Sequence, residues 1–429
     1  MSNKQTKKIL EEVLDNIKPS KQELEEIKKY LNDFLEKLNN SIKKNKINAE
    51  VFIGGSFSKN TLIKKEKYDI DIFVRFDKKY NDKEISNKLM KILSVFKSFN
   101  TVHGSRDYFS IKIKPELYFE IIPVKKIKKY QEAENVTDLS FFHVKYLNKK
   151  LKSQKILDEV RLAKAFCIAN NCYGAESYIK GFSGYSLELL VYHYKSFINL
   201  IEKISKIKNK EIIDIEKHYK NKKNILIDLN SSKLKSPIIL IDPTFKYRNA
   251  LAALSNETFK EFQKACKNFL KKPSLSAFEK KQVNIENLKK IAQKNNYEFA
   301  ITELKTNKQK GDIAGSKLFK FYKHLEKEIT NYYNIKNKEF FYNENKKAIC
   351  FFSVIPKKEI IHKGPLLSDK KNTTNFKKIH KNTYTKDNRI YSRESINKNL
   401  SDFLKNWKNK NKKKISQMNI SDFKIIKNL

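Results

Sequence analysis

The first fifty residues carry apolar side chains at the spacing of two amphipathic helices. Apolar residues three and four positions apart lie on one face of an α-helix, so each segment has a face to bury. Pro19-Ser20 marks the break between the two helices. The apolar positions are Ile9, Leu10, Val13, Leu14 and Ile17 in the first segment, and Leu24, Ile27, Leu31, Phe34, Leu35 and Leu38 in the second.

Residues 50–124 change to short runs that are typical of strands. Glu50-Val-Phe-Ile is an apolar strand that ends in two glycines, and a small helix is predicted to start near Ser58. Residues 68–76 alternate polar and apolar with the period of two that indicates a half-buried strand. The other elements predicted here are a helix over about 83–97 and strands over 108–113 and 117–124. Together they predict a mixed α/β domain that ends near residue 136.

Beyond residue 136 the pattern becomes helical, and beyond Pro273 it changes again. The middle elements predicted are helices over 138–151, 156–171 and 184–204, a strand over 237–242 and a helix near 256–271. The last ones are a strand over 297–302, a helix over 312–329, a hairpin of 339–342 with 348–355 around 343–345, and a helix over 394–408. The predicted fold class is α+β. It comprises a mixed-sheet domain (1–136), a central helical domain (137–273) and an α+β C-terminal region (274–429).

Length and composition set the class of protein. The chain has 429 residues, 39% of them hydrophobic, which suggests two to four domains with an ample core. No apolar run approaches the roughly 20 residues that a membrane-spanning helix needs, and the first residues lack the apolar core of a secretory signal. Four cysteines without CxxC spacing indicate reduced thiols and a cytoplasmic protein. The four are Cys167, Cys172, Cys266 and Cys350.

A formal net charge of +43, from 91 basic and 48 acidic residues, predicts a polyanionic partner such as nucleic acid. An A/T-rich genome would also raise the number of lysines without selecting for binding. Arginine is therefore more informative, because its planar fork can bind phosphate or a base edge with two hydrogen bonds. The six arginines are Arg75, Arg106, Arg161, Arg248, Arg389 and Arg393. A membrane surface is less favoured, since no isolated basic amphipathic helix is present.

Three acidic residues and a glycine turn form the candidate chemistry. Asp69 and Asp71 lie at i and i+2 of a predicted strand and therefore point the same way, while Glu120 lies on a later strand. Carboxylates held together repel unless a cation neutralises them, and hard oxygen ligands favour Mg²⁺. A two-metal phosphoryl-transfer centre needs such a set. The turn at Gly55-Ser56 offers backbone N–H groups and a hydroxyl to the phosphates of a nucleotide.

The specificity of this pattern lies in its order rather than in its parts. A single Asp-x-Asp or Gly-Gly-Ser is common and usually structural. The ordered set of Gly-Ser, then Asp-x-Asp, then a strand acid about fifty residues later is much rarer and favours function. The segment 311–317, Gly-Asp-Ile-Ala-Gly-Ser-Lys, is not a P-loop, because its spacing is one residue short and no Ser or Thr follows the lysine. It is predicted to begin a helix.

The surrounding motifs make the chain similar to a known family. They are Tyr68-Asp-Ile-Asp-Ile-Phe-Val-Arg-Phe76, Asp158-Glu-Val-Arg-Leu-Ala-Lys164, Tyr173-Gly-Ala-Glu176, Gly181-Phe-Ser-Gly-Tyr185 with Glu188-Leu-Leu190, and Asp242-Pro with Arg248-Asn249. In order and spacing over about residues 50–275 this set resembles the archaeal-type (class I) CCA-adding enzyme, a tRNA nucleotidyltransferase of the DNA polymerase β superfamily. The segments 271–274 and 362–365 resemble its C-terminal half more thinly.

The resemblance implies template-independent addition of C, C and A to the 3′ end of tRNA, with CTP and ATP as substrates. It implies that Asp69, Asp71 and Glu120 are catalytic and hold two Mg²⁺ ions in a nucleotidyltransferase head domain. The nucleotide-binding residues that it implies are Gly55, Ser56, Lys59, His143, Lys164, Tyr173 and Arg248, with Arg248 at the incoming base. The C-terminal region would bind the acceptor stem and elbow of tRNA. A homodimer stays open.

Two departures from the family pattern keep alternatives open. Glu120 stands where the family usually has Asp, and Lys59 stands where related chains often have Arg. One alternative is an oligo- or poly(A) polymerase, and another is a catalytically silent tRNA-binding relative. The residues also have structural interpretations. His143 could satisfy a buried helix, Arg161 is expected to be an ion-pair partner, and Tyr185 is expected to belong to the core.

Overall fold

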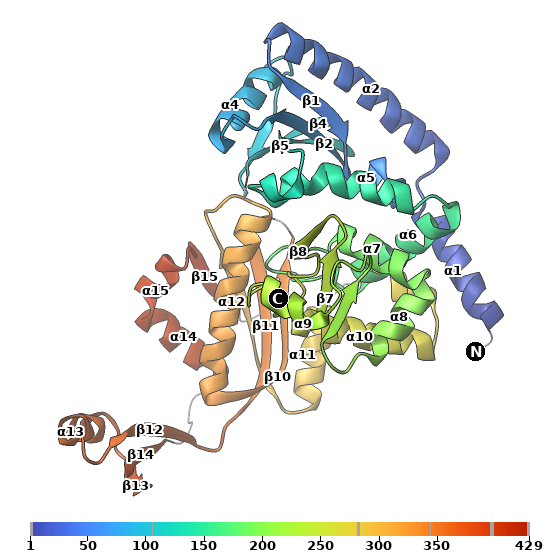
Figure 1. Cartoon of the computed structure of the whole chain (residues 1–429). Coiled ribbons are helices and arrows are strands. Elements are labelled where there is room, and N and C mark those ends of the chain that lie inside the picture. Colours follow the sequence, from blue (N-terminus) through green and yellow to red (C-terminus); the bar gives the residue numbers. More distant parts are fainter. Residues whose placement is uncertain (1–2, 105, 281–283, 344, 395–398, 427–429) are drawn as a thin grey trace. The chain divides into compact units, whose positions relative to one another are not determined.

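The computed structural model describes residues 3–104, 106–280, 284–343, 345–394 and 399–426. The chain divides into two compact units, Met1–Lys281 and Gln282–Leu429 (Figure 1). The predicted boundary between the central and C-terminal regions, at 273/274, lies close to this division. The further division of the first unit at residue 136 stays a prediction. Among the described residues, no helix has both the length and the apolar character needed to cross a membrane.

A five-stranded mixed sheet forms the N-terminal part of the first unit. Its strand order is β1-β2-β5-β4-β3, with β2 parallel to β5 and the other pairs antiparallel. The strands are β1 (Ala49–Ile53), β2 (Tyr68–Asp77), β3 (Asn100–Val102), β4 (Tyr108–Lys114) and β5 (Leu117–Lys126). Four of them were predicted, and the three-residue β3 was missed because so short a run carries no periodicity.

Two helices cover one face of this sheet, α2 (Lys21–Lys44) and α4 (Asp82–Leu93) (Figure 1). A capping box starts α2, because the Ser20 side chain accepts from the backbone of Glu23 while the Glu23 carboxylate accepts from the backbone of Ser20. Helix α4 ends at Leu93 and is shorter than predicted. The predicted small helix, α3 (Gly55–Ser58), begins earlier than expected and ends where it was expected to start.

The first helix, α1 (Asn3–Ile17), packs on a different core from α2. Its Val13 is buried with residues of the central helices, and Lys18 just beyond it pairs with Asp158 at 2.8 Å. The break at Pro19-Ser20 therefore separates two helices that bury their apolar faces against different parts of the unit.

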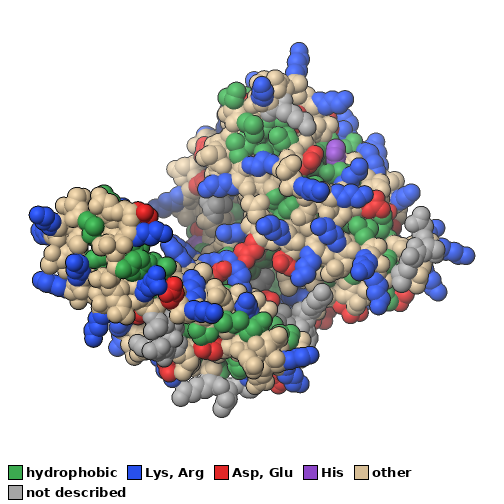
Figure 2. Space-filling view, turned by 90° about the horizontal axis from the view of Figure 1, so that it is seen from below, with side chains coloured by type: hydrophobic (Ala, Val, Ile, Leu, Met, Phe, Trp, Pro, Cys, Tyr) green, Lys and Arg blue, Asp and Glu red, His purple; other side chains and the backbone are tan. Residues whose placement is uncertain are grey.

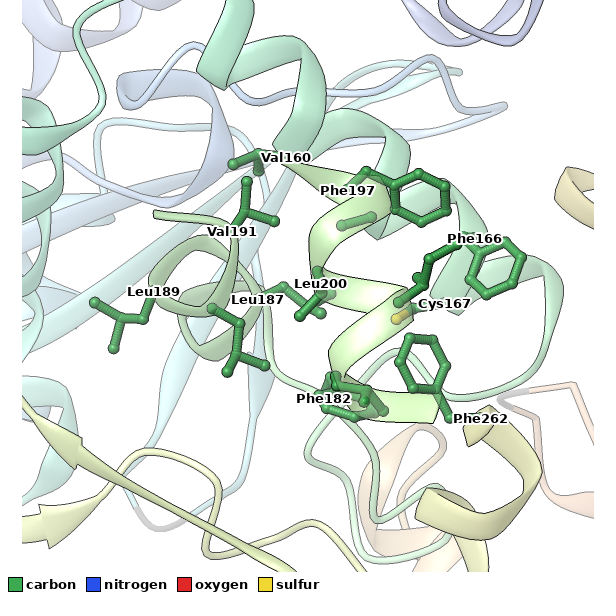
Figure 3. Close-up of a cluster of buried hydrophobic side chains, with 14 of the residues drawn as sticks. Val160, Phe166, Cys167, Phe182, Leu187, Leu189, Val191, Phe197, Leu200 and Phe262 are labelled. Atoms are coloured by element: carbon green, nitrogen blue, oxygen red, sulfur yellow. The ribbon is translucent and has the colours of Figure 1, made fainter. Parts of the chain in front are cut away.

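The central part of the first unit is a helical layer around an aromatic core. Its helices are α5 (Ser140–Lys150), α6 (Gln154–Ala169), α7 (Gly184–Tyr194), α8 (Phe197–Lys206), α9 (Lys222–Asp228) and α10 (Asn256–Lys271). Figure 3 shows Phe166, Phe182 and Phe262 gathered beside Cys167 in this core. All four cysteines of the chain are buried and free.

The predicted single helix over 184–204 is wrong, because the structure has two. Helix α7 ends at Tyr194, and the next residue, Lys195, has a left-handed φ of 72°. The Ser196 side chain then caps α8 by accepting from the backbone of Asn199. The apolar spacing on both sides of this turn hid the break. The predicted strand over 237–242 is β7 (Ile238–Asp242), flanked by β6 (Glu211–Asp214) and β8 (Phe245–Asn249), which were not predicted.

The second unit contains two separate sheets. The first has the order β10-β11-β9-β15 and buries a core with α12 (Asp312–Tyr332) and α14 (Leu400–Lys410). Its strands are β9 (Glu298–Lys305), β10 (Tyr333–Tyr342), β11 (Lys347–Pro356) and β15 (Asp422–Ile426). The predicted helix start at 311–317 is confirmed as the beginning of α12, and the β10–β11 hairpin is confirmed although Glu344 of its turn lies outside the described residues.

The second sheet, with the order β12-β14-β13, packs one face against α13 (Lys370–Ile379). Its strands are β12 (Ile360–Leu366), β13 (Thr383–Lys386) and β14 (Arg389–Glu394). Neither this sheet nor the helices α11 (Ile285–Lys294), α13 and α15 (Lys412–Gln417) were predicted. The last predicted helix, 394–408, is α14 from Leu400 onward, and residues 395–398 lie outside the described residues.

Candidate active site

Strand β2 places two aspartates on the face of the five-stranded sheet that α2 and α4 leave uncovered. Ile70 and Ile72 are buried in the core under those helices, and Asp69 and Asp71 alternate with them. In the parallel pairing of β2 with β5, Asp71 lies directly opposite Glu120. Residues that are opposite each other in neighbouring strands share a face, so the three acids lie on one side of the sheet, as the alternation predicted for the aspartate pair.

The environment of Asp69 and Asp71 disfavours the ionised form of both carboxylates. Burial raises the pKa of Asp71, Asp69 raises it further, and Lys59 and Lys65 act in the opposite direction. Burial also raises the pKa of Asp69, with Lys65 and Lys67 lowering it. A raised pKa means that the surroundings disfavour the ionised carboxylate. A bound cation would reverse that preference.

The glycine turn before α3 lies directly against Asp71. Gly55 has a φ of 62°, and a side chain there would meet the Asp71 carboxylate, because its Cβ would lie 1.7 Å from Oδ2. The backbone N–H of Gly54 donates to the carbonyl of Asp71 at 2.9 Å. Only glycine allows both this backbone conformation and this close approach. The predicted phosphate turn at Gly55-Ser56 and the predicted metal ligand Asp71 are therefore neighbours.

The three acids suit a hard divalent cation by their chemistry and shared face. Burial and a second aspartate destabilise the ionised form of such a carboxylate, and a bound divalent cation would stabilise that form again. Within the described part of the chain, no three His, Cys, Asp or Glu side chains are close enough together to hold a metal ion as they stand. The three-acid metal site therefore stays a prediction.

A second cluster joins the loop after α3 to helix α7 through Glu188. This carboxylate has no exposed surface, and its Oε2 accepts from Lys59 Nζ at 2.5 Å. Its Oε1 accepts from Lys164 Nζ at 2.8 Å and from the Thr61 hydroxyl at 2.9 Å. Lys164 also donates to Thr61 Oγ1 at 2.8 Å. Two of the predicted nucleotide-binding lysines thus share one buried acid that was not predicted to belong to the site.

Electrostatics explain how this buried acid stays ionised. Burial alone would raise the pKa of Glu188, but the attraction of Lys164 and Lys59 and their hydrogen bonds lower it to about 2. Burial lowers the pKa of Lys164 to about 8, although Glu188 raises it. Gly184 borders both Tyr173 and Lys164. A Cβ atom on Gly184 would lie 2.9 Å from the Tyr173 hydroxyl and 3.9 Å from Lys164 Cε. Burial raises the pKa of Tyr173, so its hydroxyl stays protonated.

A third cluster has Asp242, at the end of β7, as its centre. Asp242 is fully buried, and its Oδ2 accepts from Arg248 at 2.7 Å and lies 3.0 Å from His143 Nε2. Its Oδ1 accepts from the Tyr185 hydroxyl at 2.9 Å and from the Thr244 hydroxyl at 2.8 Å. Burial opposes the charge on Asp242, but its basic partners His143 and Arg248 hold its pKa well below the usual range.

The rings in this cluster also stack. His143 lies on Tyr185 with ring centroids 4.0 Å apart, and burial lowers the pKa of His143. Tyr185 was predicted to belong to the core, and its ring does pack against the central core while its hydroxyl binds Asp242. Arg161, predicted to be an ion-pair partner, pairs with Asp158 at 2.7 Å and donates to the carbonyls of Asn60 and Leu62.

A cavity of about 390 Å³ opens beside Arg248. Its lining combines the segment that leads into α5 with the N-terminal cap of α7 and the turn after β8. The lining residues include Asn135, Val136, Ser183, Phe245, Arg248 and Ala250. Arg248 is the predicted base-recognition residue; it lines this cavity, and its guanidinium is held by Asp242.

The two residues that the sequence predictions missed are the anchoring acids Glu188 and Asp242. Both stand inside the quoted motifs, Glu188-Leu-Leu and Asp242-Pro, but neither has a spacing that indicates a partner. Glu188 is 129 residues from Lys59, and Asp242 is 99 residues from His143. The available signal was that each acid stands in an otherwise apolar segment. Such a segment is expected to be buried, and a buried acid needs a partner.

The mixed five-stranded sheet and the adjoining helical layer, with acids on the sheet face opposite α2 and α4, define a nucleotidyltransferase. Family models agree with this class in two parts. A model described as tRNA nucleotidyltransferase, second domain, matches residues 158–279. A model described as Second Messenger Oligonucleotide or Dinucleotide Synthetase domain matches residues 4–143. Nucleotidyltransferases act on nucleotide substrates and generally use divalent metal ions.

Similar proteins identify the family within this class. A CCA-adding enzyme of Methanocaldococcus jannaschii is 30% identical over 422 residues, 95% of this chain and 92% of that protein. A CCA-adding enzyme of Nanoarchaeum equitans is 42% identical over 242 residues, which span 56% of this chain and 59% of that protein. This chain therefore belongs to the archaeal-type CCA-adding enzymes. The family resemblance stated from the motifs is confirmed.

Solved structures support the fold alone. Crystal structures of the Cid1 poly(U) polymerase with Mg 3′-dATP bound match with a TM-score of 0.51 at 14% identity, covering 65% of this chain and 100% of that one. A cytoplasmic RNA terminal U-transferase matches with a TM-score of 0.50, also at 14% identity. Both are consistent with the predicted α+β nucleotidyltransferase fold.

Proposed function

We propose that this protein adds C, C and A to the 3′ end of tRNA from CTP and ATP without a nucleic-acid template. The observation that carries the proposal is the 30% identity over 422 residues, 95% of this chain, with the CCA-adding enzyme of Methanocaldococcus jannaschii. A cytoplasmic location is part of the proposal, since tRNA is its substrate. A homodimer stays an open alternative.

Asp69, Asp71 and Glu120 are the proposed ligands of two Mg²⁺ ions. Their shared sheet face, the raised pKa values of both aspartates and the adjacent glycine turn support this assignment. Bound divalent ions supply activation of the attacking 3′-hydroxyl and charge stabilisation of the triphosphate. The carboxylates orient that hydroxyl, and the turn at Gly55 and Ser56 receives the phosphates.

The Glu188 and Asp242 clusters are the proposed nucleotide site. Lys59 and Lys164 are the proposed triphosphate contacts, together with Tyr173, and their shared buried acid supports this assignment. The longest of the Lys164 hydrogen bonds, 3.4 Å to the carbonyl of Thr61, is the one that a phosphate oxygen would replace at least cost. Arg248 borders the cavity and would donate to acceptor atoms that C and A share, with His143 held nearby by Asp242.

The open face of the small sheet in the second unit suits a tRNA backbone and exposed bases. Tyr384 and Tyr391 lie opposite each other and stack with centroids 5.6 Å apart, and Arg393 lies 4.8 Å over Tyr384. Helix α13 packs against β12 of this sheet, and Ile390, which belongs to the opposite face, is fully buried. Stacking surfaces with cations bind RNA by shape and phosphate contacts. We assign the acceptor stem and elbow to the second unit on this basis.

Basic side chains are not confined to that sheet. On the face seen in Figure 2, Lys and Arg side chains are spread over the whole surface with acidic ones between them. Such a distribution supports salt-dependent binding of a polyanion rather than recognition by one patch.

Mass analysis of the tRNA 3′ end tests the proposal. A tRNA without its CCA end is incubated with Mg²⁺ and CTP, with ATP, or with both. Two added C residues with CTP alone and complete CCA with both are the expected products. Long homopolymers from ATP alone would instead identify a poly(A) polymerase, and tRNA binding without any incorporation would identify the silent relative.

A further inference from the structure

We infer that Glu188 is a positioning residue that prepares Lys59 and Lys164 for the triphosphate and couples the phosphate loop to the helical layer. The inference rests on the proposed function of this site and adds a residue that the sequence predictions did not place there. Glu188 lies on α7, and Lys59 and Thr61 lie in the loop after α3, so one carboxylate connects two parts of the first unit.

The hydrogen bonds around Glu188 leave little freedom to the groups they join. Each carboxylate oxygen holds one ammonium group, and the Thr61 hydroxyl donates to Oε1 while it accepts from Lys164. The Lys59, Lys164 and Glu188 side chains are at most 9% exposed. Long lysine side chains normally lose much rotamer freedom when they bind a ligand, and here the protein has already fixed them.

The balance of charges in this cluster favours an anionic ligand. Two ammonium groups against one carboxylate leave one net positive charge in the cluster, next to the glycine turn that borders Asp71. A polyanion is the ligand that this excess attracts. Glu188 therefore favours the charged form of Lys164 and holds both lysines in place without cancelling the charge that the triphosphate would meet.

The same contacts predict a pH dependence. The charged groups that act on the Lys164 ammonium are Glu188, Lys59 and Lys65, and Thr61 accepts from this ammonium through its hydroxyl and its carbonyl. Of these, Glu188 raises the pKa of Lys164, while Lys59 and Lys65 lower it together with burial. Removal of the Glu188 charge moves the pKa of Lys164 below its present value of about 8. The ammonium would then be lost at a lower pH.

The test uses inorganic triphosphate with Mg²⁺ as the probe, titrated calorimetrically into the full chain. Glu188→Gln keeps the size of the side chain and removes its charge, while Glu188→Asp keeps the charge on a side chain that is one methylene shorter. Glu159→Gln is the matched control, since Glu159 on α6 accepts from the backbone of Phe197 and has no hydrogen bond to a described residue of the Glu188 cluster. Circular dichroism confirms that each variant is folded.

We expect the triphosphate Kd of Glu188→Gln to rise about tenfold near neutral pH, with a smaller rise for Glu188→Asp and none for Glu159→Gln. Between about pH 6 and about pH 9, binding by Glu188→Gln should be lost at a lower pH than binding by the wild type. The KM for nucleotide should rise with the Kd, and the KM for tRNA should stay within about twofold.

Wild-type-like affinity and the same pH midpoint in both Glu188 variants would overturn the inference, and so would a wild type that does not bind triphosphate. If Glu188→Gln does not fold, Glu188→Asp and its pH profile decide alone. The tRNA incorporation assay is independent of these titrations. A wild type that binds triphosphate through Glu188 but adds no nucleotides would refute the proposed function and leave the positioning role supported.

Discussion

Two groups of acids in the first unit have the same chemistry and opposite surroundings. On the sheet face, burial raises the pKa values of Asp69 and Asp71. In the helical layer, basic partners lower the pKa values of Glu188 and Asp242, although both carboxylates are more deeply buried. The difference lies in the partners that the fold supplies.

This contrast distinguishes acids that bind from acids that position. A carboxylate whose charge is satisfied by lysine or arginine holds those side chains in place and has little affinity left for a cation. A carboxylate whose charge is disfavoured gains most when a cation arrives. The sheet face is therefore the expected place for metal ions, and the two buried acids are the expected supports of the nucleotide site.

The largest expected effect is at Asp71. Asp71→Asn should reduce nucleotide incorporation by about 10³-fold or more, because the proposed metal ligand loses its charge. The same change should leave the melting temperature in metal-free buffer unchanged or higher, since the folded state disfavours the ionised carboxylate. Incorporation kinetics and thermal unfolding measure both. Near-normal turnover would remove the metal assignment.

A change at Arg248, unlike one at Asp71, is expected to lower both activity and stability. Arg248→Ala should lower kcat/KM for CTP and ATP by about 10²-fold, through the loss of donors to the base. It should also destabilise the fold by about 1–3 kcal/mol, because Asp242 loses its 2.7 Å ion pair. Arg248→Lys keeps the charge without the planar fork and is expected to recover stability more than activity. Equal recovery of both would argue against base recognition.

The dependence of folding stability on pH tests, without any substrate, whether Glu188 is ionised in the folded chain. The pKa of Glu188 is about 2 in the folded chain against an ordinary value of 4.5. Its ionised form therefore adds stability above about pH 4.5, and this stability is lost as the pH falls toward 2. Urea unfolding at a series of pH values should show a loss of the order of 2 kcal/mol that Glu188→Gln lacks.

Glu159 is the control for that measurement, because burial raises its pKa and the sign reverses. Protonation of Glu159 favours the folded state, so its contribution to stability should increase as the pH falls through its folded pKa. A wild-type acid profile identical to that of Glu188→Gln would show that the Glu188 cluster does not hold its charge in solution.

The smallest expected effect is at Glu120. Glu120→Asp shortens the side chain by one methylene, to the residue that the family resemblance led us to expect, and we expect incorporation to change by less than about tenfold, with a shift in the preference between Mg²⁺ and Mn²⁺. Initial rates in each metal measure this. A loss as large as that of Asp71→Asn would mean that the extra methylene is required for the geometry of this chain.

The elements that the sequence predicted well are those with a strong local pattern. The period of two in β2, the helical spacing of α2 after the break at Pro19-Ser20, and the bounds of α10 all follow from residues within a few positions of one another. The common face of Asp69 and Asp71 follows from the same rule. The alternation of a strand decides which way neighbouring side chains point before any tertiary contact forms.

The tertiary structure decided the rest. The break between α7 and α8 depends on one left-handed residue, Lys195, and the short strands β3, β6 and β8 form only because neighbouring strands offer partners. The roles of Glu188 and Asp242 depend on lysine, histidine and arginine side chains brought together from separate segments. Local periodicity fixes the direction of a side chain, but whether a buried acid meets a cation depends on which distant segment the fold packs against it.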